Sequence, residues 1–134
     1  MIELLLTTAI IWTTNKTITP CVFEVGYPKA CYVEKSNTIY ISKEIKGIRH
    51  DFVLYHEIGH SLYKENYPKN LFKVGFLSTA TETNADNFAW WIFAQKFPKE
   101  KKFVNSILTK EKIKYFQDTC NTKCVKDILK IKIK

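Results

Sequence analysis

Residues 49–65, RHDFVLYHEIGHSLYKE, decide the fold. Apolar side chains recur here at steps of three and four residues, which is the spacing of neighbours on a helix. They cover most of the helix circumference, and they include Phe52, Val53, Leu54, Ile58, Leu62 and Tyr63. Because a helix that is apolar over most of its surface is usually buried, we predict a central helix here. Pro68 should close the segment, since proline cannot continue the hydrogen-bond ladder.

The same helix carries a metal-binding pattern. His56 and His60 are four residues apart, so their rings lie one turn apart on one face. Both rings can reach one zinc ion at about 2.0–2.1 Å. Glu57 is rotated about 100° from His56, which places its carboxylate beside the metal, where it can take a proton from metal-bound water. Gly59 leaves room for another element to pack closely.

A hydrolytic centre needs a third protein ligand and one open position. Glu82 is the best candidate, because it begins a second helical pattern at about 81–97, after a predicted loop over 67–80. Asp86 lies one turn further on the same face, and it can accept a hydrogen bond from the free nitrogen of a ligand histidine. Asp86 is also the alternative third ligand. In another interpretation, Glu82 is only an acid in a first helical turn, favoured by the helix dipole.

The segments before the central helix have strand character. Residues 21–25, 30–33 and 38–42 are rich in β-branched and aromatic side chains, and Ser36-Asn37 forms a turn signal between the last two. They predict a small antiparallel sheet. The apolar run 4–12 predicts a buried helix or strand, with a signal sequence in 1–19 as the alternative. No run is long enough to span a bilayer.

Length and charge complete the predicted architecture. The 134 residues fit one α+β domain: 1–48 mainly sheet, 49–98 the two zinc-site helices, and 99–134 a helical Lys-rich segment broken near Thr109 and Thr122. Residues 99–134 carry 11 Lys and 4 acidic residues, which accounts for +7 of the net charge of +8. A solvated surface explains this charge best, because neither an Arg cluster nor a stacking platform accompanies it. Nucleic-acid binding is the alternative.

The four cysteines leave the redox state open. Cys120 and Cys124 are four residues apart, which predicts two thiols on one helical face that either pair or stay free. Cys21 and Cys31 are likewise undecided. An even count permits disulfides, which would indicate an oxidising compartment, but does not require them.

Three segments together resemble the ImmA/IrrE-type metallopeptidases, a family with the gluzincin arrangement of thermolysin-like peptidases. They are residues 38–42 (TIYIS), 56–60 (HEIGH) and 82–89 (ETNADNFA), and the resemblance covers roughly residues 38–93. It implies zinc, an α+β fold with an edge strand over the site, and cleavage of a protein substrate. By this resemblance the ligands are His56, His60 and Glu82, and Glu57 is catalytic. Such proteins are often encoded by phages and mobile elements.

These observations predict a zinc-dependent endopeptidase that hydrolyses a protein or peptide. It is expected in the cytoplasm or on a virion, or in the periplasm or outside the cell if the cysteines are paired. The substrate backbone is expected to add as a strand near 38–42. Candidate donors to the reacting oxygen are His50, Tyr55, Tyr63 and Tyr67. A zinc-binding structural protein without proteolytic activity, such as a virion component, is the alternative.

Overall fold

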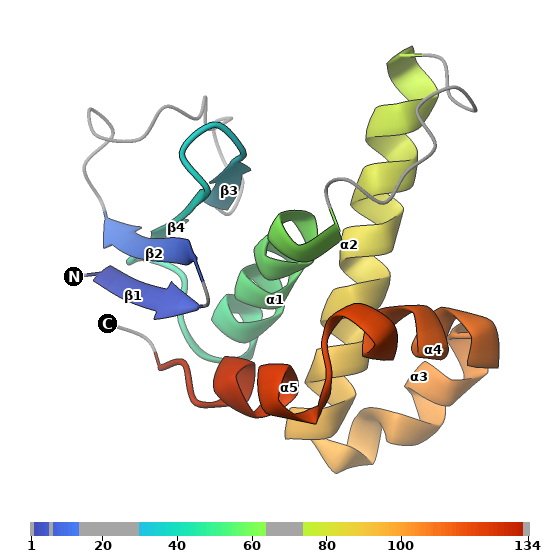
Figure 1. Cartoon of the computed structure of the whole chain (residues 1–134). Helices are drawn as coiled ribbons and strands as arrows, with labels where there is room; N and C mark the ends of the chain where they lie inside the picture. Colours follow the sequence, from blue (N-terminus) through green and yellow to red (C-terminus); the bar gives the residue numbers. More distant parts are fainter. Residues whose placement is uncertain (1, 6, 14–29, 64–73, 133–134) are drawn as a thin grey trace.

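The computed structural model describes residues 2–5, 7–13, 30–63 and 74–132. A four-stranded sheet lies against a central helix, and further helices follow on the other side of that helix (Figure 1). The strands are β1 (Ile2–Leu5), β2 (Thr8–Thr13), β3 (Ala30–Val33) and β4 (Thr38–Ser42), in the spatial order β1-β2-β4-β3. The α+β class is therefore confirmed.

The predicted antiparallel pairing of 30–33 with 38–42 is confirmed, but the sheet as a whole is mixed and not antiparallel. β1 pairs with β2 and β3 pairs with β4 in antiparallel fashion, but β2 and β4 run parallel, with Ile10 opposite Ile39. Adjacent antiparallel strands need only a short turn, whereas parallel strands need a longer crossover, and β2 and β4 are far enough apart in the chain to provide one. The predicted strand at 21–25 lies outside the described residues.

The apolar run near the N-terminus forms strands. It contributes half of β1 and most of β2, and Ile10 and Trp12 are fully or almost fully buried. Burial alternates along the first part of β2, as expected for a strand with one face on the core. The prediction of a buried element is confirmed for β2.

Two long helices carry the candidate site. The central helix α1 spans Gly47–Tyr63, close to the predicted bounds. Helix α2 spans Val74–Lys96 and begins seven residues before the predicted start at 81, so the predicted loop is wrong over 74–80. Gly75 and the Ser/Thr-rich stretch after it suggested a loop, but such residues cost a helix interior only about 1 kcal/mol or less each.

At Gly59 the helices α1 and α2 pack closely against each other. A Cβ at this position would lie 3.2 Å from the Ala85 Cα and 3.2 Å from the Phe88 Cδ2. The expected close packing is therefore confirmed, and α2 is the partner. The buried side chains around this crossing include Leu54, Tyr55, Ile58, Tyr63, Phe88, Ala89 and Ile92.

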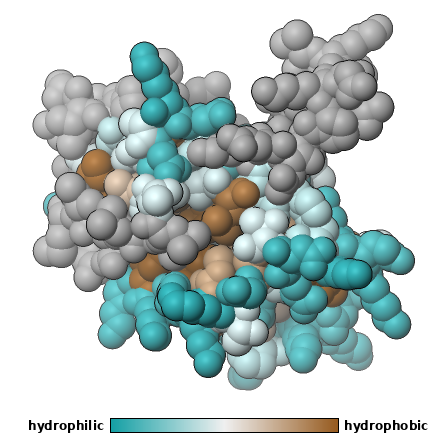
Figure 2. All heavy atoms as spheres, in the orientation of Figure 1, coloured by the Kyte–Doolittle hydropathy of each residue, from teal (hydrophilic) through white to brown (hydrophobic). Residues whose placement is uncertain are grey.

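Three short helices follow, as predicted. They are α3 (Lys101–Ile107), α4 (Lys110–Thr119) and α5 (Thr122–Leu129), preceded by the short 3₁₀ helix η2 (Pro98–Glu100). Thr109 caps α4 by accepting from the Lys112 N–H, and Asn121 caps α5 in the same way. Figure 2 shows mostly hydrophilic side chains over the lower part of the molecule, where these helices lie.

A disulfide joins Cys120 to Cys124. The two cysteines do not share one helical face, because Cys120 ends α4 and Cys124 belongs to α5. The bond therefore fixes the corner between two helices. Cys31 is also disulfide-bonded, whereas Cys21 lies outside the described residues. Within the described ranges, no helix combines the length and apolar character that crossing a bilayer requires.

Candidate metal centre

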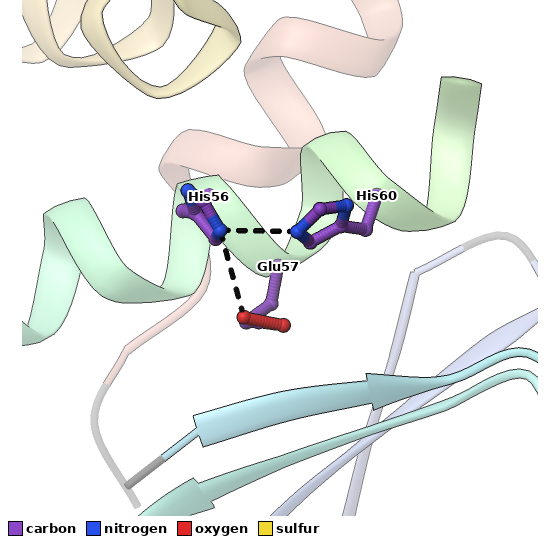
Figure 3. A group of neighbouring side chains, drawn as sticks. All are labelled: His56, Glu57 and His60. Carbon is purple, nitrogen blue, oxygen red and sulfur yellow. Dashed lines mark hydrogen bonds and ion pairs between the residues drawn. The ribbon is translucent and has the colours of Figure 1, made fainter. Parts of the chain in front are cut away.

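Two histidines and a glutamate converge between α1 and α2. The Nε2 atoms of His56 and His60 are 3.0 Å apart. Glu82 bridges them, with Oε2 at 3.0 Å from Nε2 of His56 and Oε1 at 3.0 Å from Nε2 of His60. The α1 side chains of this centre, with Glu57 beside them, are drawn in Figure 3.

This arrangement fits a tetrahedral metal ion. With zinc–ligand bonds of 2.0–2.1 Å, neighbouring ligand atoms lie about 3.3 Å apart, so separations of 3.0 Å need to open by only a few tenths of an ångström. The group formed by His56, Glu57 and His60 can hold a metal ion, because one donor atom of each lies within 4.8 Å of the others. Glu82 is a better third donor than Glu57, whose Oε1 is 3.9 Å from Nε2 of His56.

Asp86 supports the first histidine, as the sequence indicated. Its Oδ1 lies 2.7 Å from Nδ1 of His56. The side chains of Asp86 and Glu82 are 54% and 59% exposed, so water reaches this side of the centre. Of the two acids on this helix face, Glu82 contacts the Nε2 atoms and Asp86 contacts only the outer nitrogen of His56. The alternative in which Asp86 is the third ligand is therefore disfavoured.

Glu57 lies deeper than the other carboxylates. Its side chain is buried and points from α1 toward the strands (Figure 3). Burial raises the pKa of Glu57, while the positive charges of His60 and His56 and a backbone hydrogen bond from Tyr32 oppose the shift. Tyr32 belongs to β3, so this outer strand borders the centre.

The carboxylates make the site favourable for a cation. Burial alone would lower the pKa of His56, but the hydrogen bond to Glu82 and the charges of Glu57, Glu82 and Asp86 outweigh it and raise this pKa to about 9. Hydrogen bonds from His56 and His60 lower the pKa of Glu82 well below its ordinary value. Three carboxylates around two imidazoles thus favour positive charge at their centre.

The candidate oxyanion donors are placed elsewhere. His50 is fully buried and accepts a hydrogen bond from the Trp12 ring nitrogen at 2.8 Å. The Tyr63 hydroxyl donates to the backbone oxygen of Phe116 at 2.8 Å, and Tyr55 is almost fully buried. The bonds of His50 and Tyr63 and the burial of Tyr55 disfavour these three candidates, and Tyr67 lies outside the described residues.

The sequence did not predict the contact between β3 and Glu57. The hydrogen bond to Glu57 comes from the backbone of Tyr32, and a backbone group leaves no signal in the residue type. The strand expected to receive substrate was also misplaced. β4 (Thr38–Ser42) is paired on both sides, by β2 and β3, so it is not an edge. Comparisons of the chain with protein-family models, curated proteins and solved structures found no match.

Proposed function

We propose that this protein is a zinc-dependent endopeptidase of the gluzincin kind, similar to the ImmA/IrrE-type metallopeptidases. The observation that carries the proposal is the convergence of His56, His60 and Glu82, whose facing donor atoms lie 3.0 Å apart. Glu57 lies beside these atoms with its Oε1 at 3.9 Å from Nε2 of His56. Two imidazoles, one carboxylate and an adjacent free carboxylate are the donor set of hydrolytic zinc sites.

A zinc ion held there would supply a Lewis acid that polarises a scissile carbonyl and acidifies a water molecule. Glu57 accepts the proton of that water and later donates it to the leaving amine. Burial suits it to this role, because a raised pKa brings a carboxylate closer to the range in which it both takes and returns a proton. Asp86 fixes the orientation of the His56 ring.

The ligand count favours catalysis over a purely structural site. Structural zinc sites are closed by four protein ligands, whereas catalytic sites keep one position open. Among the described residues three donors converge, and the exposure of Glu82 leaves one side of the centre accessible to water. A substrate backbone reaching Glu57 would pass along the outer strand β3, which borders the centre, and not along β4.

Nucleic-acid binding through 99–134 has no specific support. The segment contributes Val104, Phe116 and Ile128 to the core, so its lysines are the solvent side of packed helices. For the location, the Cys120–Cys124 disulfide favours an oxidising compartment over the cytoplasm.

The test is the variant Glu57→Gln. Zinc content measured by atomic emission should stay near one ion per chain, while cleavage of an unfolded protein such as β-casein should fall by at least about 1,000-fold, the scale of losing a general base together with its orientation. Glu100→Gln removes an acid from η2, away from the site, and should keep full activity. Full cleavage by Glu57→Gln would refute the mechanism. Bound zinc without cleavage by the unaltered protein would favour the structural alternative.

A further inference from the structure

The metal centre is one part of a longer seam between α1 and α2. Side chains of the two helices face each other in three successive pairs. From one pair to the next, the residue on α1 is four positions earlier in the chain and the residue on α2 is four positions later. The pairs are His60 with Glu82, His56 with Asp86, and Phe52 with Trp90. Each step is about one helical turn, or 5.4 Å. The seam therefore passes from the metal centre directly into an aromatic pair.

That aromatic pair continues onto α3. The rings of Phe52 and Trp90 have centroids 4.9 Å apart, and those of Trp90 and Phe103 are 5.2 Å apart. Ile48 lies one turn before Phe52 on α1, and Ile107 lies one turn after Phe103 on α3. We name these five residues the aromatic ridge.

Within residues 7–13, 30–63 and 82–132, the aromatic ridge contains every large apolar residue that is well exposed. Ile48 is 61% exposed, Phe103 is 47% exposed and Ile107 is 44% exposed. Single exposed apolar residues need no explanation, but apolar residues connected to each other across three helices indicate an interaction surface. Phe52 and Trp90, half-buried between them, make the surface continuous.

Basic residues flank both ends of the aromatic ridge. Residues 43–49, around Ile48, contain three basic residues and one acidic residue. Residues 96–107, around Phe103, contain four basic residues and one acidic residue. Lys46, Arg49, Lys101 and Lys102 are exposed. A complementary partner therefore presents apolar side chains together with acidic ones.

We propose that the aromatic ridge docks the protein substrate of this peptidase, and that it selects a segment in which apolar side chains are flanked by acidic ones. The inference rests on the proposed function. Its basis is continuity: an extended chain advances about 3.3 Å per residue, so a substrate bound at His56 reaches the level of Phe52 and Trp90 within about two residues. An anionic membrane is the less suitable occupant, because α3 has only seven residues and no single helix presents the whole apolar surface.

The experiment measures binding separately from cleavage. Zinc-loaded Glu57→Gln protein is titrated against fluorescently labelled β-casein, an unfolded acidic protein, and compared with the same protein carrying Phe103→Ser and Ile107→Ser. Both substituted side chains are exposed, so circular dichroism should show an unchanged fold. The Kd should rise at least about tenfold, since burying even one such side chain contributes that much to affinity. Asn105→Ser, on the same helix but off the ridge, is the matched control and should leave the Kd unchanged.

A second variant tests the proposed preference for acidic side chains in the substrate. Lys101→Glu with Lys102→Glu should weaken β-casein binding about tenfold at low salt and reduce its salt dependence. Unchanged binding would overturn the acidic preference. A change of less than twofold in the Phe103 and Ile107 variant, or no casein binding by the protein with an intact ridge, would overturn the docking surface. If the ridge variant loses sedimentation with phosphatidylserine vesicles and keeps casein binding, the surface contacts membranes instead and the proposal is wrong. A failed peptidase function would instead appear as absent cleavage by the unaltered protein.

Discussion

Asp86 Oδ1 lies 2.7 Å from His56 Nδ1, and this contact determines which nitrogen of His56 faces the metal centre. A carboxylate only accepts hydrogen bonds, so Nδ1 keeps its proton, and a metal ion would displace the proton that Nε2 donates to Glu82. The interaction joins α1 to α2 and therefore also fixes how the two helices present their ligands.

Removing this carboxylate should weaken metal binding. In Asp86→Ala the His56 ring loses its orientation, so the zinc affinity should fall about 10–100-fold, as for other partners of ligand histidines. Asp86→Asn keeps an acceptor oxygen for His56, so its zinc affinity should fall less than that of Asp86→Ala. Competition with a chromophoric chelator measures both. Thr83→Ala, an exposed change on the same helix, should bind zinc normally. Equal affinities for Asp86→Ala and the unaltered protein would show that Asp86 does not orient His56.

Gly59 sets the distance between the proposed ligands of α1, His56 and His60, and the proposed ligand of α2, Glu82. A Cβ there would lie 3.2 Å from the Ala85 backbone, so Gly59→Ala should push α2 outward. Alanine has a better helix propensity than glycine, which should add about 1 kcal/mol to the free energy of unfolding. Overpacking of this kind costs about 1–3 kcal/mol, so we expect a net loss of stability. The zinc affinity should fall too, because Glu82 moves with α2. Urea unfolding and chelator competition test both effects. Arg49→Ala in the same helix serves as control, and a stable Gly59→Ala protein with normal zinc affinity would contradict the argument.

The parts of this protein that were predictable depend on neighbours in the sequence. Helix α1 follows from its apolar spacing, and the facing of His56 and His60 follows from helical geometry alone. Glu82 was predicted as the third donor because a zinc site needs one and Glu82 follows in the next helical pattern, and its carboxylate lies 3.0 Å from both Nε2 atoms. The parallel pairing of β2 with β4 was not predictable, because it depends on the path of the chain between them.

The aromatic ridge shows a second limit of sequence reasoning. Trp90 and Trp91 are adjacent and identical in type, yet Trp91 is buried and Trp90 is half-buried on the seam. A rotation of about 100° separates two neighbouring helical residues. Trp91 is buried because its ring stacks against Phe116 of α4, with centroids 5.7 Å apart, and no local pattern tells which tryptophan that helix covers.

Asn37 connects three segments of the sheet. Its Oδ1 accepts hydrogen bonds from the Tyr32 hydroxyl at 2.7 Å and the Thr8 hydroxyl at 3.1 Å, and its Nδ2 donates to Thr7 at 3.1 Å. Its φ of 49° is in the left-handed region, which asparagine tolerates better than alanine does. Asn37→Gly should therefore lose about 2 kcal/mol of unfolding free energy through the hydrogen bonds alone.

Alanine at the same position adds a backbone penalty. Asn37→Ala should be about 1 kcal/mol less stable than Asn37→Gly, because only glycine adopts a positive φ without steric cost. Urea unfolding of both variants gives the difference, and Ser36→Ala, an exposed change in the same turn, should be neutral. A glycine variant less stable than the alanine variant would contradict the conformational argument.

His50 should make the fold sensitive to acid. Burial lowers the pKa of His50, and the hydrogen bond that its Nδ1 donates to Asp51 only partly opposes this. The unfolded chain, with a histidine pKa of about 6.5, then takes up a proton before the folded chain does. Stability contributed by neutral His50 is therefore present above about pH 6.5 and is lost as the pH falls through the lower folded-state value. Protonation would also remove the acceptor for the Trp12 ring nitrogen, 2.8 Å away.

The measurement compares zinc-free protein with His50→Gln, whose side-chain oxygen can still accept from Trp12 but cannot titrate. Between pH 7.5 and 5.5 the unaltered protein should lose unfolding free energy with a slope up to about 1.4 kcal/mol per pH unit greater than that of the variant. The other titratable groups are the same in both proteins, so their contributions cancel in the difference. Urea unfolding at each pH gives the two curves. Parallel curves over this range would mean that His50 has the same proton affinity in the folded and unfolded chains, and that burial beside Trp12 does not hold it neutral.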